Sequence, residues 1–437
     1  MPQPQSARRF IDYRTAVLMV IANMIGTGVF TTLGFQAEAV PDGAALLLLW
    51  ALGGLVALCG ALSYAELAAA LPRSGGEYHF LSRIYHPALG QLAGWVSVTV
   101  GFSAPVALAA MGLGRYLATA VAWDPMVVAL ATVLVVTGLH AFDLGLGRGF
   151  QVWATGIKIG VIVAFCAAGL MVDPIPGHLP PAPSAPTLDL VLSAPFALGL
   201  IYVSYAYSGW NAAAYVVDEV QRPQRTVPRA LIDGTLVVTL LYVLLNLTFL
   251  RAIAGPELPG TVEVGALAAR YILGPEGGKL LSLALSLLLA STISAMVLAG
   301  PRVLQTMGED IPSLRPLATR NRRGAPTRAV LLQQGLAVAL ILTDSFEAVL
   351  TFAGFTLSLF GLLTVAGLIR LRRREPDLER PFRVPLYPLT PLVFITVSGF
   401  SLGVVAWERP LAMAAMLVLA GALGLILGRT GRGQRGA

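Results

Sequence analysis

The chain alternates long apolar blocks with short polar breaks, and this pattern predicts a bundle of membrane-spanning helices. Each block has about 20 residues, the length that an α-helix needs to cross a bilayer core of about 30 Å. The pattern gives twelve spans, at 14–37, 44–71, 88–118, 126–142, 149–172, 192–217, 229–254, 278–308, 327–343, 347–370, 388–406 and 410–428. Of the 437 residues, 56% are apolar and only 12% are charged, more apolar sequence than a soluble core needs. We therefore predict an all-α polytopic membrane protein.

Two of these spans are interrupted by glycine. Residues 25–30 read Ile-Gly-Thr-Gly-Val-Phe, and residues 207–211 read Tyr-Ser-Gly-Trp-Asn. Lipid offers no partners to backbone N–H and C=O groups, so an unwound helix survives in a membrane only where it lines an enclosed cavity. Paired breaks in two halves of a chain are typical of secondary transporters built from inverted repeats, which hold their substrate near the midplane.

The basic residues are distributed unevenly between the two sets of polar segments. If the N-terminus is cytoplasmic, the cytoplasmic segments hold 24 of the 30 Lys and Arg residues and the outer segments hold five. The positive-inside rule therefore predicts that both termini lie in the cytoplasm. Topology also explains the net charge of +7, so we expect no nucleic-acid partner.

Lys158 is the one basic residue that belongs to neither set. It follows Arg148 by ten residues, which places it roughly 15 Å into the membrane, near the midplane. A charged lysine there costs at least about 2.5 to 3.5 kcal/mol on insertion scales, so its default interpretation is functional. The alternative is a lysine that snorkels to the interface, but its stem is too short to reach either side.

The acidic residues are less informative. Glu66 and Glu77 lie at or beyond the end of the second span, and Asp218 and Glu219 lie at the end of the sixth. For all four, loop contacts or helix capping are a better explanation than coupling to transport.

The remaining candidate chemistry indicates no enzyme. The four histidines show no metal-ligand spacing, and the chain has no phosphate-binding loop motif. Cys59 and Cys166 fall inside apolar spans and are expected to pack as small core residues. We therefore expect no metal, no cofactor and no enzymatic activity.

Several stretches, taken together and in order, resemble the amino acid–polyamine–organocation (APC) superfamily, and within it the L-type amino acid transporter-like branch. They are the two breaks, Ala-Glu-Leu-Ala at 65–68, Leu-Pro-Arg-Ser-Gly-Gly-Glu-Tyr at 71–78, and the segments 218–229, 298–302 and 376–388. The resemblance covers nearly the whole chain. It implies a bacterial amino acid permease of the inner membrane.

The resemblance also implies the LeuT-type architecture, in which two inverted five-helix repeats, each beginning with a broken helix, precede two further helices. The expected division is an N-terminal tail 1–13, a first repeat 14–172, a proline-rich outer connection 173–191, a second repeat 192–375, a cytoplasmic loop 376–387, helices 11 and 12 at 388–428, and a tail 429–437.

The two breaks suit the two ends of an α-amino acid. A half-helix that begins after Gly26 presents free N–H groups to a carboxylate, and the carbonyls freed in the sixth span suit an ammonium. By position, the carboxylate site is Gly26, Thr27 and Gly28. The family's positions for the ammonium and side chain fall on Tyr205, Ala206, Ser208 and Asn211. The alternatives are close helix packing at the glycines and simple aromatic packing at Tyr205.

The resemblance gives Lys158 a role. Sodium-coupled relatives hold a cation between the first break and hydroxyls of the eighth span, and many L-type-like members place a lysine there. The matching groups are the carbonyls of Ala22 and Ile25 and the hydroxyls of Ser291 and Thr292. Sodium-independent exchange or facilitated transport is the expected activity, and proton symport is the alternative.

Departures from the family pattern refine these expectations. The segment 118–125 lacks the cysteine that joins animal members to an accessory subunit, so we expect no disulfide-linked partner and a monomer or weak homodimer. Neither break contains Asp or Glu, and Asp218 and Glu219 lie too near the cytoplasm, so we expect no acidic residue placed to bind a second ammonium. The expected substrates are therefore small or medium neutral L-amino acids. The other possibilities are a channel, which the mostly apolar spans disfavour, and a transporter-derived sensor or scaffold without transport.

Overall fold

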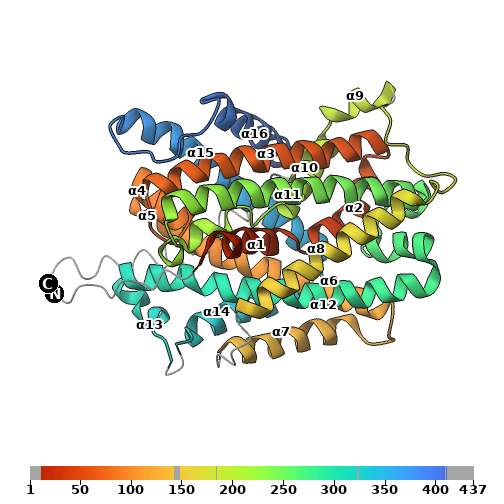
Figure 1. Ribbon diagram of the computed structural model, residues 1–437, viewed down its shortest axis with the longest axis horizontal. Coiled ribbons are helices and arrows are strands. Elements are labelled where there is room, and N and C mark those ends of the chain that lie inside the picture. The colour runs from red at the N-terminus through yellow and green to blue at the C-terminus, as the bar shows by residue number, and fades with distance from the viewer. Residues whose placement is uncertain (1–10, 142–147, 184, 322–323, 409, 411–437) are drawn as a thin grey trace.

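The computed structural model describes residues 11–141, 148–183, 185–321, 324–408 and 410. This part of the chain is helical, with two isolated β-bridges and no sheet. The long helices lie side by side along one axis (Figure 1). The α-helices, long and short, are α1 Tyr13–Met24, α2 Gly28–Ala39, α3 Gly43–Ala70, α4 Glu77–Ile84, α5 Pro87–Val96, α6 Ala104–Ala118, α7 Pro125–Ala141, α8 Arg148–Met171, α9 Ala185–Val191, α10 Ala194–Ala206, α11 Pro223–Ala252, α12 Val264–Asp310, α13 Arg315–Ala318, α14 Thr327–Ile341, α15 Phe346–Arg374 and α16 Leu389–Glu408.

Eight helical stretches in the described part are long and apolar enough to cross a membrane, and α7, α10 and α14 are shorter apolar helices. The chain is therefore a polytopic helical membrane protein. The expected spans correspond closely to these helices, but the last one, 410–428, lies outside the described residues except for residue 410. One helix, α11, begins earlier than the hydropathy pattern predicts, at Pro223. α12 is kinked at Gly274, where φ is +78°, and its part after the kink corresponds to the expected span 278–308.

The first span is divided into two helices at its glycines. α1 ends at Met24, α2 begins at Gly28, and residues 25–27 are not helical. The start of α1 is fixed by Asp12, whose carboxylate accepts a hydrogen bond of 2.9 Å from the backbone N–H of Thr15. The break is therefore a local interruption between two well-formed half-helices.

The second break follows α10. That helix ends at Ala206, a turn occupies residues 207–211, and a short 3-10 helix, η2, follows at Ala212–Tyr215. Gly209 has φ +98°, a conformation that favours glycine. A π-helical segment, η1 at Ser97–Ser103, joins α5 to α6; such segments occur frequently at functional sites.

The remaining helices hold these breaks in the centre of the bundle. α11 packs along α3, and α12 packs along α6. α4 lies at one end of the bundle and α9 near the other (Figure 1). Near α9, residues 255–265 cover α2: the N–H of Gly260 donates 3.1 Å to the carbonyl oxygen of Gly34.

Candidate functional site

Lys158, on α8, joins the first break to α12. Its side chain is 1% exposed. Its Nζ donates a hydrogen bond of 2.9 Å to the carbonyl oxygen of Ile25 and one of 2.8 Å to Oγ1 of Thr292. Burying an ammonium is costly unless its protons are accepted by polar groups, and here a freed carbonyl and a hydroxyl accept two of the three.

The other two residues expected around Lys158 are sequence neighbours of these partners. Ala22 and Ser291 are both buried. The two hydrogen bonds described for Nζ go to Ile25 and Thr292 instead. The Thr292 hydroxyl also lies 3.1 Å from the Ile25 carbonyl oxygen, so lysine, carbonyl and hydroxyl form a closed triangle.

The two breaks touch each other through glycine. A Cβ atom on Gly28 would lie 2.6 Å from Cα of Ala206, and one on Gly209 would lie 2.6 Å from the carbonyl oxygen of Asn23. Both distances are too short for any side chain, so glycine allows the two interrupted segments to approach this closely. Close packing, the alternative interpretation of Gly28, therefore applies at this position.

Tyr242, on α11, connects both breaks. Its hydroxyl lies 2.6 Å from the carbonyl oxygen of Met24 and 3.1 Å from that of Ala206. The ring is fully buried and packs against Trp50 and Tyr207. No pattern in the sequence singles out this residue, because an aromatic side chain on an apolar helix usually reflects packing alone.

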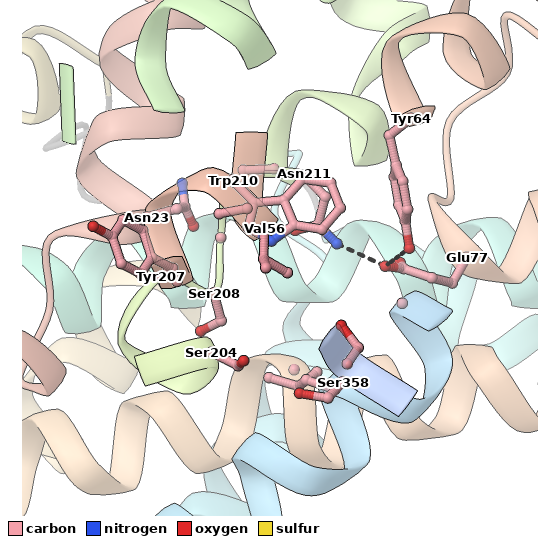
Figure 2. A pocket seen from close by; sticks show the side chains of 18 of the residues that line it. Asn23, Val56, Tyr64, Glu77, Ser204, Tyr207, Ser208, Trp210, Asn211 and Ser358 are labelled. Atoms are coloured by element: carbon pink, nitrogen blue, oxygen red, sulfur yellow. Dashed lines mark hydrogen bonds between the residues drawn. The ribbon is translucent and has the colours of Figure 1, made fainter. Parts of the chain in front are cut away.

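A cavity of about 70 Å³ lies beside the second break. That volume is several times the minimum that holds one water molecule. Its polar lining consists mainly of Asn23, Glu77, Ser204, Ser208, Asn211 and Ser358 (Figure 2). Two polar atoms of this lining, Oδ1 of Asn23 and Oγ of Ser358, are buried and have no hydrogen-bonding partner within the described chain. Unpartnered buried polar atoms are costly, so they favour a polar ligand in this cavity.

The expected substrate residues divide into two groups. Ser208 and Asn211 line the cavity. Gly28 and Ala206 meet at the contact between the two breaks, whereas Gly26 faces Thr292 and Thr27 faces Gly112. None of the five other expected residues belongs to the cavity lining: Gly26, Thr27, Gly28, Tyr205 and Ala206.

An acidic residue lines the cavity, although neither break contains Asp or Glu. Glu77, at the start of α4, lines the cavity and is 6% exposed. Oε1 of Glu77 accepts hydrogen bonds of 2.7 Å from the Tyr64 hydroxyl and 2.6 Å from Nδ2 of Asn211, and Oε2 accepts one from the Tyr215 hydroxyl. The chain after α3 folds back beneath the second break, so a residue that the sequence places beyond a span returns to the cavity.

Charged side chains close the end of the bundle near α4. Arg73 pairs with Asp310 at 2.6 Å, and the Tyr78 hydroxyl donates to the same carboxylate at 2.9 Å. Burial, with a smaller contribution from Arg73, lowers the pKa of His79 to about 4. These contacts tie the segment before α4 to the end of α12.

The fold and the site therefore define a multi-pass membrane protein with two helix breaks, a buried lysine and a small polar cavity. The chain matches the amino acid permease family over residues 11–422 and belongs to that family, within the APC superfamily of amino acid transporters.

Its relatives are amino acid transporters and exchangers. The serine/threonine exchanger SteT of Bacillus subtilis is 28% identical over 89% of this chain and 89% of its own. The mouse b(0,+)-type amino acid transporter 1 is 26% identical over 90% of this chain and 82% of its own. The human cystine/glutamate transporter is 26% identical over 94% of this chain and 83% of its own.

Proposed function

We propose that this protein moves small or medium neutral L-amino acids across the plasma membrane by sodium-independent alternating access. The observation that carries this proposal is the contact of Lys158 with the Ile25 carbonyl and the Thr292 hydroxyl. Freed carbonyls and hydroxyls beside a helix break are the ligands with which transporters of this architecture coordinate sodium. A lysine held among them provides the same charge from within the chain.

The proposed architecture is the LeuT type. The repeats are 14–172 and 192–375, joined by the outer connection 173–191, with helices 11 and 12 at 388–428 after the loop 376–387. Both termini, 1–13 and 429–437, lie in the cytoplasm in this proposal, because the segments on that side carry most of the Arg residues. We propose a bacterial inner-membrane protein that works without a disulfide-linked subunit, as a monomer or weak homodimer.

The proposed substrate site uses both breaks. The free N–H groups at the start of α2, at Gly26, Thr27 and Gly28, suit the substrate carboxylate. The second break, from Tyr205 and Ala206 through Ser208 to Asn211, suits the ammonium and side chain. The cavity beside it is small and rich in hydroxyl and amide groups, which supports small polar or neutral amino acids. The relative SteT is named a serine/threonine exchanger, which supports the same class of substrate.

Uptake of radiolabelled amino acids into proteoliposomes tests this proposal. Vesicles are loaded with a panel of unlabelled amino acids, and uptake is measured with and without an inward proton gradient. We expect uptake to depend on an internal small neutral amino acid and to be independent of the proton gradient. Stimulation by the gradient would replace exchange with proton symport, in which Lys158 releases its proton. If no amino acid produces flux or competition, the transport proposal fails and a sensor or scaffold remains.

A further inference from the structure

The carboxylate of Glu77 is buried in the cavity wall and has no cationic partner among the residues that the structure describes. It accepts hydrogen bonds from three neutral groups, on Tyr64, Asn211 and Tyr215. None of the ion pairs in the described part of the chain includes Glu77. A carboxylate offers about four lone-pair sites, so three of them are already occupied. Little capacity is left for a direct bond to a second ammonium, which explains how an acidic residue can line a cavity for neutral substrates.

The carboxylate determines which way the Asn211 amide faces. An ionised carboxylate can only accept hydrogen bonds, so Asn211 must turn its NH₂ group toward Glu77, as the 2.6 Å contact has it (Figure 2). The amide oxygen is on the opposite branch of the side chain. Asn211 therefore keeps a hydrogen-bond acceptor for the cavity that it lines.

A second amide of the cavity lining, that of Asn23, is oriented by a hydrogen bond in the same way. Nδ2 of Asn23 donates 2.8 Å to the carbonyl oxygen of Met19, which leaves Oδ1 as the free atom. That oxygen is buried without a hydrogen-bonding partner in the described residues, and so is Oγ of Ser358. Two amides, one near the end of α1 and one in the second break, thus offer acceptors to one small cavity. The ligand group that fits two amide oxygens is a donor with several hydrogens, and a primary ammonium has three.

We propose that Glu77 is a positioning residue for substrate recognition: it holds the Asn211 amide with its oxygen toward the cavity, where that oxygen and Oδ1 of Asn23 accept hydrogen bonds from the ammonium of a small amino acid. This inference rests on the proposed transport of amino acids and adds which atoms receive the ammonium. Glu77 acts through Asn211 and does not touch the substrate.

A double-mutant cycle tests this proposal. A glutamine at position 77 can donate as well as accept, so Glu77→Gln releases the Asn211 amide. With L-serine as the probe, or the amino acid that the uptake panel identifies, we expect Glu77→Gln to raise KM about tenfold and to change the maximal rate by less than about twofold. In an Asn211→Ala background the same substitution should leave KM unchanged, because the residue through which it acts is gone. An equal rise of KM in both backgrounds would overturn the proposal.

Tyr64→Phe is the matched control. It deletes a hydrogen bond to the same Glu77 oxygen but leaves the carboxylate facing Asn211. We expect KM to stay within about twofold of wild type. If Tyr64→Phe raises KM as much as Glu77→Gln, the network has only a structural role and the proposal is wrong.

Two provisions keep the test decisive. Equilibrium binding of L-serine to purified protein is measured by calorimetry, so variants that no longer turn over still report an affinity. If Glu77→Gln is not recovered as folded protein, the cycle is run with Glu77→Asp, whose effect must likewise vanish in the Asn211→Ala background. The two failures are distinguishable: wild type without flux of any amino acid defeats the proposed function, whereas wild-type transport with an affinity indifferent to Glu77→Gln defeats only this inference.

Discussion

The Nζ atom of Lys158 lies 2.9 Å from the carbonyl oxygen of Ile25, which α1 leaves without a helical partner where it breaks. This bond connects the half-helix α1 to α8, and through Thr292 to α12. A single buried side chain thus links an unwound segment to two long helices. In the proposed mechanism this contact holds the break in place during transport.

Substitution of Lys158 by alanine removes the bridge to α8. A hydrogen bond from a charged group contributes about 1.5 to 3 kcal/mol, so we expect transport to fall at least about tenfold. The chain should still fold, because the Thr292 hydroxyl keeps its own contact of 3.1 Å with the Ile25 carbonyl. Exchange into proteoliposomes, normalised to folded protein by size-exclusion chromatography, measures the loss.

Lys279 provides the control for this experiment. It is the other lysine of the chain, it is exposed, and it pairs with Glu276 at 2.9 Å. Lys279→Ala should leave the rate of exchange within about twofold of wild type. Equal losses in the two variants would show that the effect of Lys158→Ala is not specific to the break.

The hydroxyl of Tyr242 is expected to stabilise both breaks. Tyr242→Phe leaves the carbonyls of Met24 and Ala206 without this donor, which should cost about 1 to 3 kcal/mol and lower the maximal exchange rate about tenfold. Tyr207→Phe, which removes a hydroxyl contact of 3.0 Å to the Trp50 carbonyl and leaves the Met24 and Ala206 carbonyls with their donor, is the control and should cost less. Thermal unfolding in detergent and initial exchange rates report the two effects. A larger loss for Tyr207→Phe would contradict this ranking.

Gly209 combines a positive φ with a close contact. Its φ is +98°, and a Cβ atom would lie 2.6 Å from the Asn23 carbonyl oxygen. Gly177 has φ +79° with open space around it. Gly177→Ala should therefore cost only the backbone strain, about 1 kcal/mol, whereas Gly209→Ala should cost more and reduce exchange. Thermal unfolding of the two variants separates strain from contact, and equal costs would rule out a role for the contact.

His79 should make the protein less stable in acid. Burial lowers its pKa to about 4 in the folded chain, below the ordinary value of 6.5, so folding favours the neutral ring. The stabilisation is present above pH 6.5 and is lost as the pH falls toward 4, by up to about 3 kcal/mol. His79→Gln should flatten this part of the pH profile of thermal unfolding. If the variant and the wild type lose stability in parallel, His79 does not contribute.

The sequence predicted the elements of this site that depend on the membrane alone. The rise of a helix places Lys158 far from both ends of its span, and the structure buries it beside the first break. The glycines were enough to locate both breaks. These predictions work because lipid imposes depth and hydrogen-bonding limits on every residue of a span.

The residues that the sequence analysis missed depend on contacts between distant segments. Glu77 reaches the cavity because α4 turns back beneath the second break, and no local pattern encodes that return. Tyr242 looks like any aromatic residue of an apolar span until its hydroxyl is seen beside Met24. In both cases the sequence showed a polar group, the Glu77 carboxylate or the Tyr242 hydroxyl, but it did not show which group binds to it.

The central claim is that Lys158 makes sodium unnecessary, and exchange in the absence of sodium tests it most directly. Wild-type proteoliposomes are prepared with choline in place of sodium on both sides, and exchange of the amino acid identified by the uptake panel is timed against vesicles that contain sodium. We predict equal initial rates in the two buffers. A rate without sodium that falls to the level of protein-free vesicles would contradict the claim.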